Sequence, residues 1–387
     1  MLDGAGLYIH YPWCVKKCPY CDFNSHPIKA DVDQEAYCAA LLSDWSAQHR
    51  QGDHFHSVFF GGGTPSLMQT QYIERLLSVL PISPRAEITL EVNPGTHEYM
   101  DFHDSRKTGV NRLSIGAQSF NDKQLQTLGR VHQSDEIVLA FDKARAAGFE
   151  NINLDVMWGL PEQSVDEALQ DLQRAIELQP EHLSWYQLTI EAKTEFARRT
   201  PILPVEQTAY DIETAGLELL AKNGFRRYEI SAFAQSGQQC EHNLNYWQFG
   251  DYLGLGAGAH GKRSSNDIDG DAEQPIRVSK ASQPRLYLAD PRASTERSID
   301  AEAMVVEFMM NALRLVDGVE WTLLEQRTGL SRGDLEPQWS RLEASELVTA
   351  ERCGTTPKGL RYLDSILEGS VSYTHLTLPT NQCVYFS

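Results

Sequence analysis

The first two-thirds of the chain alternate short β-forming runs with amphipathic stretches. Runs rich in branched and aromatic residues occur at 6–11, 57–60, 87–92, 112–117, 152–157 and 182–189. Helical periodicity separates several of them, at 33–50, 69–80 and 165–178. This regular alternation predicts a parallel sheet with helical crossovers, either open or closed into a barrel.

Unusual polar or glycine-rich positions fall where the predicted strands end. Cys14 follows the first strand and Gly61–Ser66 the second. Glu91 ends the third, Gln118 follows the fourth, and Asp155 lies near the end of the fifth. Because the carboxyl ends of parallel strands meet at one edge of the sheet, we expect these residues to form the functional site.

The alternation stops near residue 299. Amphipathic stretches at 301–315, 321–328 and 334–345, followed by a short hairpin at 347–354, predict a small helical, winged-helix-like domain. The polar stretch 262–275 reads as a boundary. We therefore divide the chain into a barrel (1–262), a linker or loop region (263–298), a C-terminal helical domain (299–369) and a tail (370–387).

The tail differs in composition from the rest of the chain. It has no charged residue, is rich in Thr and Ser, and follows a helix that already looks complete at 363–367. We expect it to be a non-native extension, such as a frameshift product, and exclude it from the functional reading.

Charge and hydropathy narrow the class of protein. The chain carries 34 Lys and Arg against 53 Asp and Glu, a net charge of −19, which disfavours binding to nucleic-acid phosphates. No stretch approaches eighteen consecutive apolar residues, so we expect no membrane span. The N-terminus does not resemble a signal peptide, and we expect a cytoplasmic protein.

Three of the seven cysteines lie within one short segment, as Cys14, Cys18 and Cys21. A structural zinc site wants four ligands, which His10 or His26 could complete. Three cysteines on a 4Fe–4S cluster instead leave one iron open to a further ligand. Both sites remain possible from the spacing alone, and the next strand end, GGGTPS, allows close backbone approach to a ligand.

The C-x3-C-x2-C spacing together with Gly62, Gly63 and Thr64 resembles the radical S-adenosylmethionine superfamily. That resemblance implies a 4Fe–4S cluster on the three cysteines and S-adenosylmethionine on its open iron, with exposed backbone groups of the glycine turn contacting the methionine end. It also implies a partial (β/α)6 barrel, similar to a TIM barrel, with a small C-terminal domain.

The similarity extends to the oxygen-independent coproporphyrinogen III oxidases and their relatives, over roughly residues 7–367. It implies that further residues contact S-adenosylmethionine, some of them around a second molecule. These are Tyr8, Tyr20, Glu91, Gln118, Arg130 and Asp155. Taken singly, the acids would more often be satisfied strand-end carboxylates, and Arg130 a surface ion pair.

Two details resemble the HemW-type haem chaperone branch of that family. The oxidases carry a fourth cysteine two residues after the third, where this chain has Phe23. The H-N-x-x-Y-W motif of the branch is present as His242, Tyr246 and Trp247. The resemblance implies that His242 ligates haem iron from a loop near the barrel mouth and that the two aromatic rings stack on the porphyrin.

His260 is a weaker candidate for haem ligation, and the nearby Cys240 thiol could link to a haem vinyl group. The expected function is haem binding and delivery to an acceptor protein, perhaps in the respiratory chain, with a reductant such as flavodoxin or ferredoxin. The alternatives are oxidative decarboxylation of coproporphyrinogen III and a zinc-stabilised structural module. The branch indicates a chaperone more than an enzyme.

Overall fold

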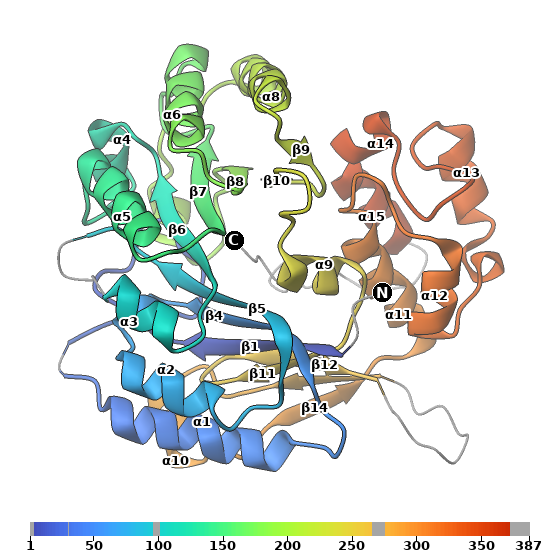
Figure 1. The fold of residues 1–387 in the computed structure, drawn as a ribbon. Helices are drawn as coiled ribbons and strands as arrows, with labels where there is room; N and C mark the ends of the chain where they lie inside the picture. Colours follow the sequence, from blue (N-terminus) through green and yellow to red (C-terminus); the bar gives the residue numbers. More distant parts are fainter. Residues whose placement is uncertain (1–3, 30, 96–100, 265–274, 372–387) are drawn as a thin grey trace.

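A twelve-stranded sheet organises the chain in a computed structural model that describes residues 4–29, 31–95, 101–264 and 275–371. Six strands follow one another in chain order and pair in parallel, as the sequence pattern predicts. They are β1 (Ala5–Tyr11), β4 (Phe55–Gly62), β5 (Ile82–Val92), β6 (Arg112–Gln118), β7 (Ile152–Trp158) and β8 (His182–Gln187). The predicted parallel α/β sheet with helical crossovers is thereby confirmed, as a curved and open sheet (Figure 1).

Helices cover the outer face of this curved sheet (Figure 1). They are α1 (Gln34–Gln48), α2 (Thr70–Leu77), α3 (Phe102–Lys107), α4 (Asp122–Thr127), α5 (Ser134–Ala146), α6 (Val165–Glu177) and α8 (Glu206–Lys222). The start of α6 shows how the sequence specifies them. Ser164 and Glu167 form a capping box, and the helix then buries Leu172 and Ile176 at helical spacing.

The main core lies between this sheet and its helices. β4 is buried at seven successive positions, and Val58 and Phe60 have no exposed surface. Burial on both faces is why the central strands read as continuous apolar runs instead of alternating ones. Each fully buried side chain of this kind contributes about 1.5–3 kcal/mol to folding.

Both edges of the parallel sheet are extended. β11 (Tyr252–Leu255) pairs in parallel with β1, and β12 (His260–Arg263), β13 (Ile276–Ser279) and β14 (Thr295–Ser298) follow in antiparallel order. At the other edge, β10 (Ala232–Ala234) and β9 (Arg226–Arg227) are antiparallel. The expectation of a linker at 263–298 is therefore wrong over 275–298. The reason is that edge strands such as IRVS and TERS carry polar residues and lack an apolar run.

The C-terminal helices lie together at one side of the sheet (Figure 1), and most of them contribute to a second apolar cluster. They are α11 (Ala301–Ala312), α12 (Trp321–Thr328), α13 (Gln338–Ala344), α14 (Pro357–Arg361) and α15 (Leu363–Val371). The helix expected at 334–345 begins later, because Pro337 lies at its start, and 332–335 form a separate 3-10 turn. The expected hairpin is present as a bridge between Val348 and Thr355.

Helix α15 continues to Val371, past the residue at which we expected it to end, and the rest of the tail (372–387) lies outside the described residues. Within the parts of the chain that the structure describes, no helix has the length and apolar character needed to cross a bilayer.

A buried ion pair fastens the 275–298 segment to the barrel. Lys280 Nζ lies 2.6 Å from Asp44 Oδ1 on α1, and both side chains are fully buried. Asp44 also accepts hydrogen bonds from the Tyr287 hydroxyl and the Gly256 amide. Burial raises the pKa of Asp44 from its ordinary value, and the charge of Lys280 opposes that rise.

Removing Lys280 should therefore be costly. We expect Lys280→Ala to lower the free energy of unfolding by about 3–5 kcal/mol, because it leaves the Asp44 carboxylate buried without a cation. Urea denaturation would measure the loss. Lys107→Ala is the control, since Lys107 pairs with Asp104 at the surface, and its cost should stay below about 1 kcal/mol. Equal costs for the two variants would contradict the proposed anchor.

Candidate functional site

The three clustered thiols lie on one loop at the carboxyl end of β1. Cys14 ends the short strand β2 (Trp13–Cys14), just after β1, and is 6% exposed, whereas Cys18 and Cys21 are half-buried. The backbone closes a turn in which the Cys21 amide donates to the Cys18 carbonyl at 3.1 Å. Lys17 reaches across the loop, and its ammonium donates to the Phe23 carbonyl at 2.8 Å. The loop is therefore held in part by its own residues.

The electrostatics of the loop suit a cationic cluster. Burial, followed by the charge of Cys21, raises the pKa of the Cys14 thiol to about 11, and burial also raises the pKa of Cys21. Thiols in this state bind iron only by losing their protons, which a metal cation promotes. Three sulfur ligands on one loop match the donor set of a 4Fe–4S cluster with one iron left open. Among the described residues, no group of three or more His, Cys, Asp or Glu side chains is placed so that all of them could bind one metal ion.

The glycine turn at the end of β4 packs against the chain that leads into this loop. A Cβ at Gly62 would lie 2.6 Å from the His10 ring, and one at Gly63 would lie 2.4 Å from the Trp13 carbonyl oxygen. The Gly63 and Thr64 amides donate to Tyr11 and Trp13 carbonyls, and the Gly62 amide donates to Glu91. These three N–H groups are therefore paired within the protein, and the expected contact of the turn with a cofactor stays a prediction that its carbonyl groups would carry. The glycines are also needed because two backbone segments pass so closely.

His10 and His26 do not complete a zinc site with the thiols. His10 Nε2 donates to the Asn24 carbonyl at 2.9 Å, so Nδ1 accepts from the Tyr8 hydroxyl at 3.0 Å. His26 Nε2 lies 3.2 Å from the Asn24 side-chain oxygen. Burial lowers the pKa of His10 to about 4, which keeps it neutral. His10 thus connects Tyr8 to the cysteine loop.

Two carboxylates, on β5 and on β7 with β6 between them, face the same region; Asp155 is buried and Glu91 is half-buried. Burial and the charge of Asp155 raise the pKa of Glu91 well above its usual range. Burial also raises the pKa of Asp155, while donors from Asn153 at 2.7 Å and Ser114 at 3.1 Å oppose the rise. The charge of Asp155 disfavours a second negative charge on Glu91, and a ligand that brings a positive charge or hydroxyl donors offsets that effect. The sulfonium, amine and ribose of S-adenosylmethionine fit this requirement.

Arg130 joins the cysteine loop to the strand ends. One of its nitrogens donates to the Cys18 sulfur at 3.7 Å, and the other donates to the Gly116 carbonyl at 3.0 Å and to the Asn93 side chain. Gln118, at the end of β6, accepts from the Tyr186 hydroxyl at 2.7 Å.

Tyr20 lies in the same region, near Arg130 and Cys18. Burial is the main cause that raises the pKa of its hydroxyl, which also senses the charges of Arg130 and Cys18. The structure therefore collects the expected residues Tyr8, Tyr20, Glu91, Gln118, Arg130 and Asp155 around the cysteine loop.

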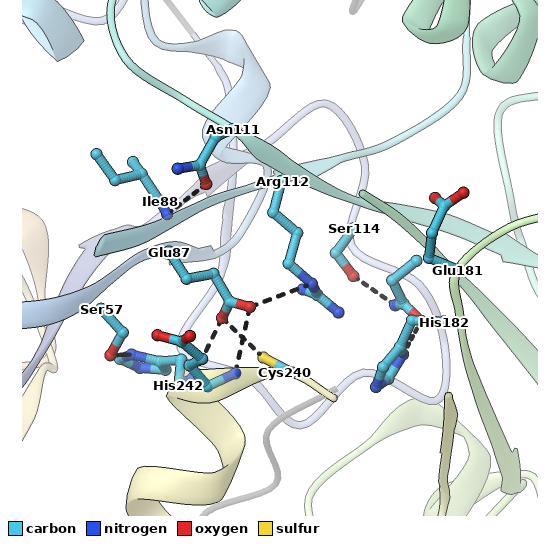
Figure 2. A network of polar contacts seen from close by, with 12 residues as sticks. Ser57, Glu87, Ile88, Asn111, Arg112, Ser114, Glu181, His182, Cys240 and His242 are labelled. Carbon is cyan, nitrogen blue, oxygen red and sulfur yellow. Dashed lines mark hydrogen bonds and ion pairs between the residues drawn. The ribbon is translucent and has the colours of Figure 1, made fainter. Parts of the chain in front are cut away.

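The H-N-x-x-Y-W motif lies elsewhere. His242 is on helix α9 (Glu241–Trp247) and not in a loop, and it is fully buried. Its Nδ1 lies 2.9 Å from the Ser57 hydroxyl (Figure 2). Its Nε2 lies 3.0 Å from the Tyr246 hydroxyl. Burial lowers the pKa of His242 to about 3. In this arrangement neither ring nitrogen is available to haem iron.

The two aromatic residues of the motif are also packed. The Tyr246 ring lies 4.5 Å from that of Tyr252, and the Arg314 guanidinium lies 4.3 Å from the centre of the Trp247 ring. Both aromatics belong to the apolar cluster shared with the C-terminal helices. Their observed role is to join the barrel to these helices, and the expected stacking on a porphyrin stays a prediction.

Glu87, near the start of the buried part of β5, fixes the start of α9. Its carboxylate accepts from the Cys240 thiol and from the Glu241 and His242 amides, each at 3.2 Å, and Arg112 lies 3.8 Å away (Figure 2). Cys240 is fully buried, and burial raises the pKa of its thiol strongly. The geometry does not support a covalent haem link at Cys240. Because Ser57, Glu87 and Arg112 precede the carboxyl ends of their strands, α9 covers the opposite end of the sheet.

Comparison with known proteins places this geometry in a family. The radical SAM superfamily matches residues 8–175, and the HemN C-terminal domain matches residues 299–361. The chain is 44% identical over 375 residues to the Heme chaperone HemW of Escherichia coli (strain K12), covering 95% of this chain and 98% of that protein. The chain belongs to the HemW family of the radical SAM superfamily. This membership implies a 4Fe–4S cluster and S-adenosylmethionine.

Other relatives agree. The Heme chaperone HemW of Haemophilus influenzae is 43% identical over 95% of this chain and 98% of its own length. The solved structure entitled "Coproporphyrinogen III oxidase (HemN) from Escherichia coli is a Radical SAM enzyme" matches with a TM-score of 0.77. That match covers 96% of this chain and 90% of the other, at 23% identity, and so it establishes the shared fold alone.

Sequence reasoning missed two residues that build the site and gave a third a different role. Asn93 and Tyr186, which were missed, hold Arg130 and Gln118, and His10, considered only as a zinc ligand, holds Tyr8. Each lies in an apolar strand or just after one, where a single polar residue gives no sign of its partner. Their roles depend on contacts between strands that are distant in sequence.

The buried position of His242 gives a stability prediction. We expect His242→Ala to lower the free energy of unfolding by about 2–4 kcal/mol, because the Ser57 and Tyr246 hydroxyls lose their partner inside the protein. His103→Ala, at an exposed histidine of α3, is the control and should change stability by less than about 0.5 kcal/mol. Thermal and urea denaturation would test this. Wild-type stability in the His242 variant would show that the motif histidine is not part of the core.

Proposed function

We propose that the protein is a haem chaperone that binds haem and transfers it to an acceptor protein. The main support is the full-length similarity to proteins named haem chaperones, since it covers nearly the whole of both chains. The residue two positions after the last cysteine of the motif agrees with this choice. Phe23 occupies the position of the fourth cysteine of the oxidases, and its carbonyl accepts from Lys17.

We propose that Cys14, Cys18 and Cys21 hold the cluster and that S-adenosylmethionine lies between it and the strand ends. When bound, this pair supplies one-electron cleavage chemistry. Arg130 would fix the Cys18 side of the loop, and Glu91 and Asp155 would face the positively charged and hydroxyl groups of the ligand. Tyr8 and Tyr20 would shield the same region. Burial raises the pKa of both hydroxyls, so both remain protonated.

The proposed partners are haem, an acceptor haemoprotein of the respiratory type, and a low-potential reductant such as flavodoxin or ferredoxin. The proposed setting is the cytoplasm. The acidic net charge of −19 favours acceptor surfaces that are neutral or basic, because like charges oppose association.

Anaerobic reconstitution tests the function directly. We expect about four irons per chain and a cluster whose electron paramagnetic resonance signal changes with S-adenosylmethionine. The same sample should bind haem stoichiometrically and pass it to an apo-haemoprotein. It should not convert coproporphyrinogen III when reductant is added. Repeated turnover of that substrate would establish the oxidase alternative, and stoichiometric zinc in place of iron would establish the structural one.

The structure favours His260 over His242 as the residue that contacts haem. His260 begins β12 and is exposed. Partial desolvation and the charge of Arg277 lower the pKa of its imidazole, which keeps it neutral and able to ligate iron. The Asn24 amide donates to the Ala257 carbonyl at 2.9 Å, so the loop before His260 packs directly on the cysteine loop.

We therefore expect His260→Ala to weaken haem binding about tenfold and to shift the Soret band. Titration of haem into the protein, followed by absorbance, measures both effects. His242→Ala, studied well below its melting temperature, should keep the wild-type spectrum. The reverse pattern would return His242 to the role of ligand and would require α9 to move when haem binds.

A further inference from the structure

The end of β6 contains a strained turn. Gln118 has a φ of 67°, in the left-handed region that non-glycine residues seldom occupy. The Ser119 amide donates to the Ala117 carbonyl at 2.9 Å, which closes a three-residue turn around Gln118. A γ-turn with positive φ is rare and costs free energy, so the surrounding structure must hold it in place.

Asp171 on α6 provides that hold. Its Oδ2 accepts from the Ser119 hydroxyl at 2.6 Å, and its Oδ1 accepts from the Phe120 amide at 2.7 Å. These two residues follow Gln118 directly, so both oxygens of one carboxylate are bound just beyond the strained position. Asp171 is 3% exposed, so these two hydrogen bonds are buried.

Asp171 also contacts the loop that follows β7. The Gln163 amide nitrogen lies 3.5 Å from Asp171 Oδ2, and its oxygen accepts from the Leu160 amide at 3.1 Å. Asp171 therefore ties the turn after β6 to the loop after β7. Burial raises the pKa of Asp171 to about 6, so at pH 8 the side chain is an anion and accepts both hydrogen bonds from the turn.

The turn determines where the Gln118 side chain points. The Tyr186 hydroxyl binds the amide oxygen at 2.7 Å, which directs the amide nitrogen the other way. A Cβ placed on Gly116 would lie 3.0 Å from that nitrogen and 3.3 Å from Arg130 Nη2. The Gln118 donor thus lies over the strand end beside the guanidinium that contacts Cys18.

We propose that Asp171 is a positioning residue for S-adenosylmethionine binding, which it supports by holding Gln118 in its strained turn. This inference rests on the proposed cofactor site. Asp171 does not contact the site itself, so its effect passes through the turn at 118–120. A role limited to packing α6 would instead change stability and leave the affinity of folded protein unchanged.

The test uses the cluster-reconstituted full chain at pH 8 and equilibrium dialysis with S-adenosylmethionine. We expect Asp171→Ala to raise the dissociation constant about tenfold, with iron content unchanged. Asp171→Asn should have a smaller effect, because its amide oxygen can still accept from Phe120. Asp166→Asn is the matched control on the same helix, since Asp166 is exposed, and it should bind as wild type.

A double-mutant cycle with Gln118→Ala separates positioning from packing. If Asp171 acts through Gln118, Asp171→Asn should cause no further loss of affinity in the Gln118→Ala background. Additive losses, or wild-type affinity in both Asp171 variants, would overturn the inference. If Asp171→Ala does not fold, the Asn variant and the cycle still decide the matter. Failure of the wild-type chain to bind S-adenosylmethionine would instead refute the proposed cofactor site.

Discussion

Parallel pairing is the constraint on which the structure depends. Because β1, β4, β5, β6, β7 and β8 run the same way, residues that follow six separated strands meet at one edge of the sheet. The cysteine loop, the two carboxylates and Arg130 come together for this reason. The opposite end of the parallel strands is covered by α9, whose start is fixed by the Glu87 carboxylate. The two ends of the sheet thus have different roles, one for the candidate cofactors and one for closure.

Buried charge is the second theme, and the structure treats it differently in different places. Asp44 and Lys280 neutralise each other directly. Glu87 is satisfied mainly by N–H and S–H donors, with Arg112 at a greater distance. Glu91 differs, because burial and the charge of Asp155 raise its pKa well above the usual range, whereas the donors around Asp155 oppose the rise in the pKa of that carboxyl. A carboxyl whose pKa is strongly perturbed by burial and a nearby charge is a candidate for a functional site.

Several predictions from the sequence agree with the structure because they depend on residues that lie near one another along the chain. The six parallel strands follow from runs such as SVFF and EITLEV, and the cysteine loop follows from spacing alone. The polar edge strands β13 and β14 could not be recognised, because a strand at a sheet edge needs no apolar run. The position of His242 was wrong for a related reason. Its motif is short and amphipathic, and a buried helix and a ligand-binding loop share that appearance.

By itself the sequence determined the fold class, the thiol set and the family, since periodicity and residue spacing are properties of the chain in one dimension. Only the tertiary structure decided which polar groups are accessible. It buried His242 between Ser57 and Tyr246, left His260 exposed, and placed Asp171 of α6 against the turn that holds Gln118. Accessibility and partner choice arise from contacts between segments far apart in sequence, and these contacts exist only once the sheet has formed.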